Sequence, residues 1–168
     1  MSYQQHQHDA SGIVVGCAVV TLSDTRTEAT DSSGAAIQRL LAEAGHKVLH
    51  YEIVHDEPAE FDPLLARLLG RADVEVVLTN GGTGISRRDQ TIQVVQRRLD
   101  TVLDGFGELF RSLSYQEIGS GAMLSRAVGG VARGKLVFAM PGSTKAVELA
   151  MTKLILPELR HLVSQVRK

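Results

Sequence analysis

The feature that most constrains the fold is a regular alternation between strand-like apolar runs and stretches with helical spacing. Ile13–Leu22 is nearly all apolar, as expected for a strand covered on both faces. Lys47–Val54 and Val74–Thr79 are further strand-like runs, and a helical stretch precedes each of them. The order strand, helix, strand, helix, strand predicts an α/β fold with a parallel sheet and right-handed crossovers.

The first two helical stretches have clear ends. Ser32 or Ser33 is expected to cap a helix that runs to Ala44 and ends at Gly45. The second stretch ends at Gly70 and has its apolar residues at helical spacing. These are Phe61, Leu64, Leu65, Leu68 and Leu69.

The second half of the chain predicts four more helices and a hairpin. The helices are expected over Thr91–Leu99, Gly105–Glu117, Ser143–Leu154 and Pro157–Val166. Ala127–Val131 and Lys135–Met140 flank Ala132, Arg133 and Gly134, which is typical of a hairpin. The hairpin would add an antiparallel strand at the edge of the sheet.

The length fits one domain. The chain has 168 residues, close to the roughly 150 residues typical of one domain. Met1–Gly12 is polar and poor in apolar side chains, which predicts a flexible tail. No linker, repeat or low-complexity segment divides residues 13–168, which we expect to form a single domain.

Composition excludes several classes of function. Eighteen Lys and Arg against nineteen Asp and Glu leave no basic excess, so a broad nucleic-acid surface is not expected. The longest apolar run, Ile13–Val20, is far shorter than the roughly twenty residues that cross a membrane. Cys17 is the only cysteine, which excludes an internal disulfide and favours a cytoplasmic location.

The most informative segment is the glycine-rich loop Gly81-Gly82-Thr83-Gly84, between a predicted buried strand and a predicted helix. Glycine tolerates positive φ and has no Cβ, so successive backbone N–H groups can converge on a phosphate or carboxylate. Ligands of doubly wound sheets bind at the carboxyl ends of the strands, where this loop lies. The alternative is a tight turn that binds nothing.

Two acidic positions are expected at the same edge. Asp89 precedes the helix that begins near Thr91, and Asp56 follows the strand that ends at Val54. Together they predict a Mg²⁺ site facing nucleotide phosphates. Capping of the following helix is the alternative role for Asp89.

Two more loops emerge at this edge. Ser23 and Asp24 follow the first strand, and Pro141-Gly142-Ser143 follows the last strand and opens a helix. Ser143 is a plausible N-cap, and the free N–H groups behind it would suit an anion.

Familiar phosphate motifs are absent. Gly129–Lys135 has Walker spacing, but Leu136 replaces the required Ser or Thr, and a strand follows where a helix is needed. No complete G-x-G-x-x-G exists, which disfavours a dinucleotide-binding Rossmann domain. Cys17 lies within an apolar strand and is interpreted as a core residue.

The chain resembles the molybdenum cofactor biosynthesis protein B and Mog family, which is related to the G domain of gephyrin. The resemblance covers Val15–Leu162. It depends on the order and spacing of Ser23-Asp24-Thr25-Arg26, Asp31-Ser32-Ser33-Gly34, Gly81-Gly82-Thr83-Gly84, Arg88-Asp89, Ser120, Met123-Leu124-Ser125-Arg126-Ala127 and Pro141-Gly142-Ser143.

The resemblance implies a three-layer α/β/α molybdopterin-binding fold that assembles as a homotrimer or as a hexamer of paired trimers. It implies molybdopterin adenylyltransferase activity, in which ATP and molybdopterin give adenylyl-molybdopterin and pyrophosphate with Mg²⁺. Other proteins of molybdenum cofactor biosynthesis are expected partners. The alternative is a protein that binds molybdopterin or its precursor, or scaffolds a partner, without turnover.

Carried over by motif, the resemblance makes Asp56 and Asp89 the catalytic and Mg²⁺-binding residues. Family members usually have Pro-Asp at the first position, where this chain has His55-Asp56. The substrate-binding residues would be Ser23, Asp24, Gly81, Gly82, Thr83, Gly84, Ser120, Ser125, Pro141, Gly142 and Ser143.

Overall fold

The computed structural model describes Tyr3 and residues 10–168. Most of the predicted tail, residues 1–12, lies outside this range. Within the described part of that segment, Ala10 is buried and its carbonyl accepts a hydrogen bond from the N–H of Ile13.

The sheet has six strands in the order β2-β1-β3-β6-β5-β4. β1 pairs in parallel with β2 and β3, and β3 pairs in parallel with β6. β5 is antiparallel to both β6 and β4. The strands are β1 (Gly16–Leu22), β2 (Lys47–Val54), β3 (Val76–Asn80), β4 (Thr101–Val102), β5 (Val128–Ala132) and β6 (Lys135–Met140).

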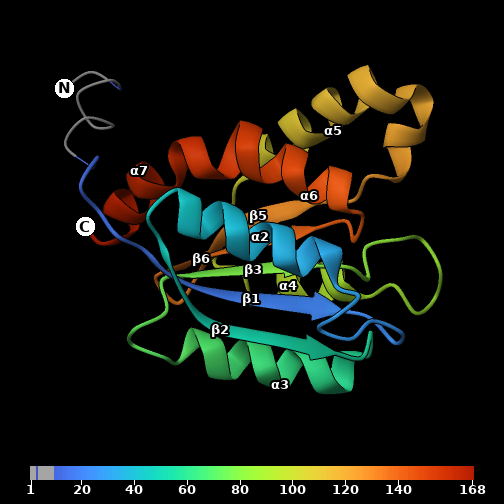
Figure 1. The fold of residues 1–168 in the computed structure, drawn as a ribbon, viewed down its shortest axis with the longest axis horizontal. Helices are drawn as coiled ribbons and strands as arrows, with labels where there is room; N and C mark the ends of the chain where they lie inside the picture. The colour runs from blue at the N-terminus through green and yellow to red at the C-terminus, as the bar shows by residue number, and fades with distance from the viewer. Residues whose placement is uncertain (1–2, 4–9) are drawn as a thin grey trace.

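Helices cover both faces of the sheet, which gives three layers (Figure 1). α3 and α4 pack on one face, and α2, α5, α6 and α7 pack on the other. The bounds are α2 (Ser32–Glu43), α3 (Pro58–Leu69), α4 (Thr91–Arg98), α5 (Asp104–Ile118), α6 (Thr144–Ala150) and α7 (Leu156–Val166). The predicted mostly parallel α/β/α fold is therefore confirmed, and the predicted strands and helices agree with it to within a few residues.

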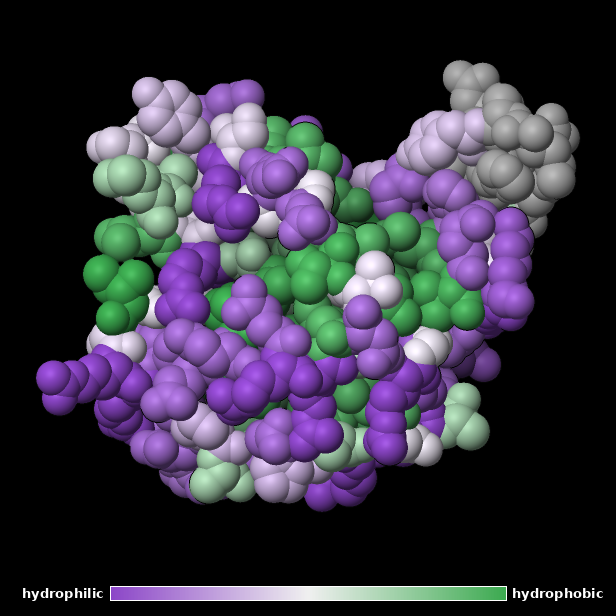
Figure 2. Space-filling model, turned by 180° about the vertical axis from the view of Figure 1, so that it is seen from behind, coloured by the Kyte–Doolittle hydropathy of each residue, from purple (hydrophilic) through white to green (hydrophobic). Residues whose placement is uncertain are grey.

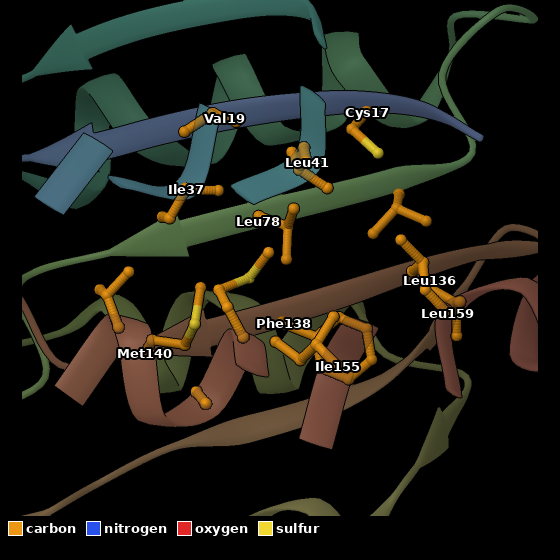
Figure 3. Close-up of a cluster of buried hydrophobic side chains, with 14 of the residues drawn as sticks. Cys17, Val19, Ile37, Leu41, Leu78, Leu136, Phe138, Met140, Ile155 and Leu159 are labelled. Atoms are coloured by element: carbon orange, nitrogen blue, oxygen red, sulfur yellow. The ribbon is translucent and has the colours of Figure 1, made fainter. Parts of the chain in front are cut away.

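Two hydrophobic clusters fill the spaces between the layers. Alternate residues of β1 and β3 point to opposite faces, so Val19 and Leu78 join the cluster under α2 while Val20 and Val77 join the one under α3. Figure 3 shows the first cluster, where Leu41 of α2 and Ile155 and Leu159 near the C-terminus point towards the strands. Cys17 lies in this cluster, and burial raises the pKa of its thiol to about 12, as befits a core residue.

Three local predictions need correction. Asp31, rather than Ser32 or Ser33, caps α2, because its carboxylate accepts the N–H of Gly34. The antiparallel edge contains one more strand than expected, the two-residue β4. The two closing helices are one continuous helical run joined by a π-helical segment, Met151–Ile155. Pro157 follows this segment and has no N–H to donate, which disturbs the regular α-helical pattern upstream.

The predicted hairpin turn is confirmed. Arg133 and Gly134 are the two residues between β5 and β6, and their φ angles are 51° and 72°. Positive φ at both positions is the geometry of the turns that suit two-residue hairpins. No helix within the described part of the chain is both long and apolar enough to cross a membrane.

His46 lies at the start of β2 and predicts a pH dependence of stability. Its Nδ1 accepts the N–H of Val15 at 3.2 Å, and burial followed by the positive charge of Arg160 lowers its pKa below 6.5. A lowered folded-state pKa means that the unfolded chain binds more protons below pH 6.5. The stabilisation from neutral His46 is therefore complete above that pH and decreases as the pH falls towards the folded-state pKa.

We expect the free energy of urea unfolding to fall between pH 7 and pH 5 in the wild type, and to fall less in His46→Asn. The Asn carbonyl can accept from Val15 but does not titrate. His55→Gln, at an exposed position, is the control and should keep the wild-type slope. Equal slopes for the wild type and His46→Asn would contradict the prediction.

Candidate functional site

Four loops meet where β1, β2, β3 and β6 end (Figure 1). Backbone hydrogen bonds join neighbouring loops: the N–H of Ser23 donates to Val54 O at 2.9 Å, and the N–H of Gly81 donates to Met140 O at 3.1 Å. The predicted site loops therefore lie side by side at one edge of the sheet.

A buried carboxylate organises the first of these loops. Asp31 is 1% exposed, and its two oxygens accept hydrogen bonds from Thr21, Ser33, Gly34 and Tyr51. The Thr21 hydroxyl donates at 2.6 Å and the Tyr51 hydroxyl at 2.7 Å. Burial raises the pKa of Asp31, but these donors outweigh burial and hold the pKa below its usual value. Asp31 is therefore ionised at neutral pH.

The network extends to the end of β3. The side-chain amide of Asn80 donates to the Thr21 hydroxyl at 2.9 Å, and its carbonyl oxygen lies 2.8 Å from the Ser33 hydroxyl, whose one proton is shared between Asn80 and Asp31. Thr21, Asn80 and Ser33 are all buried. This arrangement fixes the end of β3 relative to β1 and to the start of α2.

Arg26 connects the same network to the last loop. Its guanidinium donates to Gly142 O at 2.8 Å, to Asp31 at 3.4 Å and to the Ser33 hydroxyl. The Pro141-Gly142-Ser143 loop is thereby tied to the loop that follows β1. A hydroxyl contact of 2.7 Å between Ser32 and Thr144 adds a second tie, between the first turns of α2 and α6.

The glycine-rich loop is in close contact with its surroundings. Gly81 has φ +96°, and a Cβ there would lie 2.2 Å from Leu22 O. A Cβ at Gly142 would lie 3.2 Å from the Cα of Gly81. These contacts require glycine at position 81 and leave little room for a side chain at position 142.

Asp56 and Asp89 both lie against this loop. A Cβ at Gly82 would be 2.3 Å from Asp56 Oδ1, and a Cβ at Gly84 would be 2.7 Å from Asp89 Oδ2. The missing side chains therefore make room for two carboxylates of the chain itself, so the loop and both acidic residues form one structural unit.

Asp89 does not cap α4, which was the alternative role for this residue. Its carboxylate instead accepts the N–H of Ser86 at 2.9 Å and the Ser86 hydroxyl, which closes the loop upon itself. The N-cap position of α4 is Gln90, without a side-chain cap.

Negative charge accumulates around Asp56. Partial burial raises the pKa of its carboxyl group, and the nearby carboxylates of Asp89 and Asp24 raise it further, while Arg88 opposes this. Arg88 forms ion pairs with Asp24 at 2.8 Å and with Glu57 at 2.9 Å. The site thus carries more acidic than basic side chains, a balance that favours a cation.

The other predicted residues have varied surroundings. The Ser23 hydroxyl accepts two backbone N–H groups of its own loop. Ser143 caps α6, as predicted, by accepting the N–H of Ala146 at 3.2 Å. Thr83 is buried and Pro141 is half-buried.

Ser120 and Ser125 lie apart from the four loops along the chain. Ser120 is exposed on the 3₁₀ segment Gly119–Leu124, and Ser125 follows that segment. Arg126, next to Ser125, connects this segment to the site by donating to Gly84 O at 2.7 Å.

Sequence reasoning missed four residues of the site. Arg26 and Arg126 belong to the motifs of the family resemblance and Thr91 to an expected helix start, but the sequence assigns no role to them or to Asn80. Asn80 is the last residue of β3 and directly precedes the glycine-rich loop, which was the available signal for it, whereas Arg26, Thr91 and Arg126 lie farther from the loop along the chain. Their contacts join residues far apart in the chain, and local patterns do not reveal such contacts.

Asp56 and Asp89 are the two carboxylates that pack against the glycine-rich loop. Within the described residues, no group of three or more His, Cys, Asp or Glu side chains could hold a metal ion by itself. Mg²⁺ is commonly bound by one or two carboxylates together with substrate phosphates, so the arrangement suits an ion that arrives with a phosphate ligand.

Residues 18–161 match the family described as the probable molybdopterin binding domain. The chain belongs to this family. Molybdenum cofactor biosynthesis protein B of Bacillus cereus is 53% identical over 169 residues, which cover 100% of this chain and 99% of the relative.

Solved structures agree with the assignment. A crystal structure of a molybdenum cofactor biosynthesis protein B is 56% identical, has a TM-score of 0.90 and covers 92% of this chain and 97% of the other. The tungsten cofactor synthesizing protein MoaB from Pyrococcus furiosus is 35% identical, with a TM-score of 0.83 and coverage of 92% and 98%. The expected molybdopterin-binding fold is confirmed, and the relatives support a role in molybdenum cofactor biosynthesis.

The packing of Gly82 predicts that a single methyl group disturbs the site. We expect Gly82→Ala to lower stability by about 1–2 kcal/mol from positive φ alone, and to displace Asp56 as well. Gly105→Ala is the matched control, because a Cβ at Gly105 meets nothing within 4 Å. Thermal unfolding of both variants tests this, and an equal melting temperature for the wild type and Gly82→Ala would contradict it.

Proposed function

We propose that the protein is a molybdopterin adenylyltransferase, which joins the AMP part of ATP to molybdopterin and releases pyrophosphate. The observation that carries the proposal is the packing of Asp56 and Asp89 against Gly82 and Gly84, beside a second loop that opens α6. Membership of a molybdopterin-binding family supports the identity of one substrate.

The reaction requires few catalytic groups from the chain. The phosphate monoester of molybdopterin is already anionic and attacks the α-phosphorus of ATP, while the bond to pyrophosphate breaks. No strong general base is needed, so catalysis depends on aligning two anions and on neutralising the charge of the leaving group. Backbone N–H groups of the Gly81–Gly84 loop and the loop Pro141–Ser143 are suited to that alignment.

Mg²⁺ would neutralise the developing charge on the phosphates. The residues present fit this ion, because Mg²⁺ prefers oxygen ligands and two carboxylates flank the loop. The buried hydroxyl of Thr91 beside these carboxylates has no hydrogen-bond partner within the described residues, so it is free to bond to a group at the site. Asp56 and Asp89 would hold the ion, with the positive charge of Arg88 close to Asp56.

Ser23, Asp24, Thr83, Ser120 and Ser125 are proposed as further substrate contacts. Ser120 and Ser125 lie on the segment that Arg126 connects to Gly84. That segment could contact the pterin while the four strand-end loops contact the phosphates. The alternative, binding without turnover, would use the same residues.

One assay separates the two functions. The protein is incubated with ATP, Mg²⁺ and molybdopterin, and adenylyl-molybdopterin is sought by mass spectrometry. Product formation supports the transferase. Saturable molybdopterin binding with no product would assign the binding-only role.

We expect Asp56→Asn and Asp89→Asn each to remain folded and to lower turnover on the order of a hundredfold, because ion positioning is lost. Asp73→Asn is the matched control. Asp73 pairs with Arg71 on the surface and should leave turnover unchanged. Wild-type turnover in both site variants would contradict the metal assignment.

Self-association is a second part of the proposal. A groove of about 680 Å³ runs between α5 and α7, beside the edge strand β4. Its apolar lining includes Val102, Leu103, Leu109, Leu154, Pro157 and Leu162. Seen from behind, hydrophobic residues gather in a hollow at the centre of the molecule (Figure 2). Apolar surface of this kind is typical of contact between subunits.

Light scattering should therefore give the mass of a closed assembly. Three chains of 18.1 kDa give about 54 kDa and six give about 109 kDa. Leu109→Lys should lower the mass because Leu109 is exposed in the groove, whereas Leu49→Lys on the opposite edge strand should not. A wild-type protein that is monomeric at micromolar concentration would contradict self-association and leave the catalytic proposal intact.

A further inference from the structure

Two neighbouring oxygen atoms beside the glycine-rich loop have no hydrogen-bond partner in the described part of the chain. One is the hydroxyl of Thr91, the first residue of α4, which is 2% exposed. The other is Oδ1 of Asp56. Both lie within 2.3 Å of the point that a Cβ of Gly82 would occupy, so only the absence of that atom allows them to approach each other.

Local structure offers Thr91 no other partner. The backbone N–H of Thr91 already donates to Gly82 O at 3.2 Å, which leaves the hydroxyl as the free group of this residue. A small hollow bounded by Leu22, Asp56, Phe61, Thr91 and Val94 has no room for a water molecule. A water in that hollow is therefore excluded as the partner.

The carboxylate of Asp56 also lacks a bonding partner in the described chain. Within the described residues, its carboxylate accepts no hydrogen bond and forms no ion pair, whereas Asp89 accepts from Ser86 and Asp24 pairs with Arg88. The charged groups nearest to it include Asp24, Glu57 and Asp89, with Arg88 as the opposing charge. No hydrogen bond or ion pair within the described chain fixes the rotation of this carboxylate.

We propose that Thr91 is a positioning residue whose hydroxyl donates to Oδ1 of Asp56 when that carboxylate turns to hold a divalent cation. This hydrogen bond fixes Oδ1 of Asp56 and directs Oδ2 of the same carboxylate to the ion. Gly82 is needed for this hydrogen bond because a Cβ at that position would occupy the space between the Thr91 hydroxyl and the Asp56 carboxylate. This inference rests on the proposed metal-dependent function and adds to it a residue that acts through Asp56.

The test compares Thr91→Val, which removes the hydroxyl at nearly constant shape, with Thr91→Ser, which keeps it. Mn²⁺ binding to the full chain is measured by electron paramagnetic resonance with a non-hydrolysable ATP analogue, which supplies the phosphate ligands, and without molybdopterin. We expect Thr91→Val to bind Mn²⁺ about tenfold more weakly, the scale seen when a group that orients a metal ligand is removed. Thr91→Ser should bind as the wild type does.

Thr79→Val is the matched control. The hydroxyl of Thr79 is also buried and without a partner in the described residues, but Thr79 lies in the sheet between Val20 and Ala139. Its loss should leave Mn²⁺ binding unchanged. The melting temperature of Thr91→Val should be no lower than that of the wild type, because the hydroxyl has no partner to lose in the metal-free chain.

Asp56→Asn separates failure of this inference from failure of the proposed function. If Asp56→Asn loses Mn²⁺ binding while Thr91→Val keeps wild-type affinity, the role of Thr91 is overturned and the metal site stands. If Thr79→Val weakens binding as much as Thr91→Val, the role of Thr91 is also overturned. If the wild type shows no saturable binding, or Asp56→Asn binds equally well, the metal site fails and the inference fails with it.

Discussion

The buried carboxylate of Asp31 is the group on which the geometry of the site depends. Burying a charge away from water is unfavourable in free energy. Hydrogen bonds from four residues offset this here, and the donors are Thr21, Ser33, Gly34 and Tyr51. The same carboxylate caps α2 and contacts Arg26, which reaches the carbonyl of Gly142. The end of β1, the start of α2 and the loop after β6 are therefore held around one negative charge.

The parts of the fold that could be predicted are those with a short-range pattern in the sequence. The burial of Phe61, Leu64 and Leu68 follows from their helical spacing, and the turn at Arg133 and Gly134 follows from its position between two apolar runs. The two-residue strand β4 is too short to leave a periodic signal. The cap of α2 was misplaced by one or two residues because Asp31, Ser32 and Ser33 are all good caps, and only the tertiary contacts of Asp31 decide between them.

The candidate site was predicted in outline, because parallel strands bring their carboxyl ends to one edge. This rule places Asp56, Asp89 and the glycine-rich loop near one another without any knowledge of their contacts. It could not show that Gly82 makes room for Asp56, or that Arg126 reaches Gly84 across 42 positions of the sequence. Such contacts depend on loop conformation and on side-chain length, which periodicity and spacing do not encode.

The close approach of Gly81 and Gly142 has an evolutionary consequence. A Cβ at position 142 would lie 3.2 Å from the Cα of Gly81. A side chain at position 142 would require the loops after β3 and β6 to move apart slightly, and position 81 cannot become smaller because it is already glycine. Sequence change is therefore constrained on both loops where they meet, whereas the tips of the loops are not subject to this constraint.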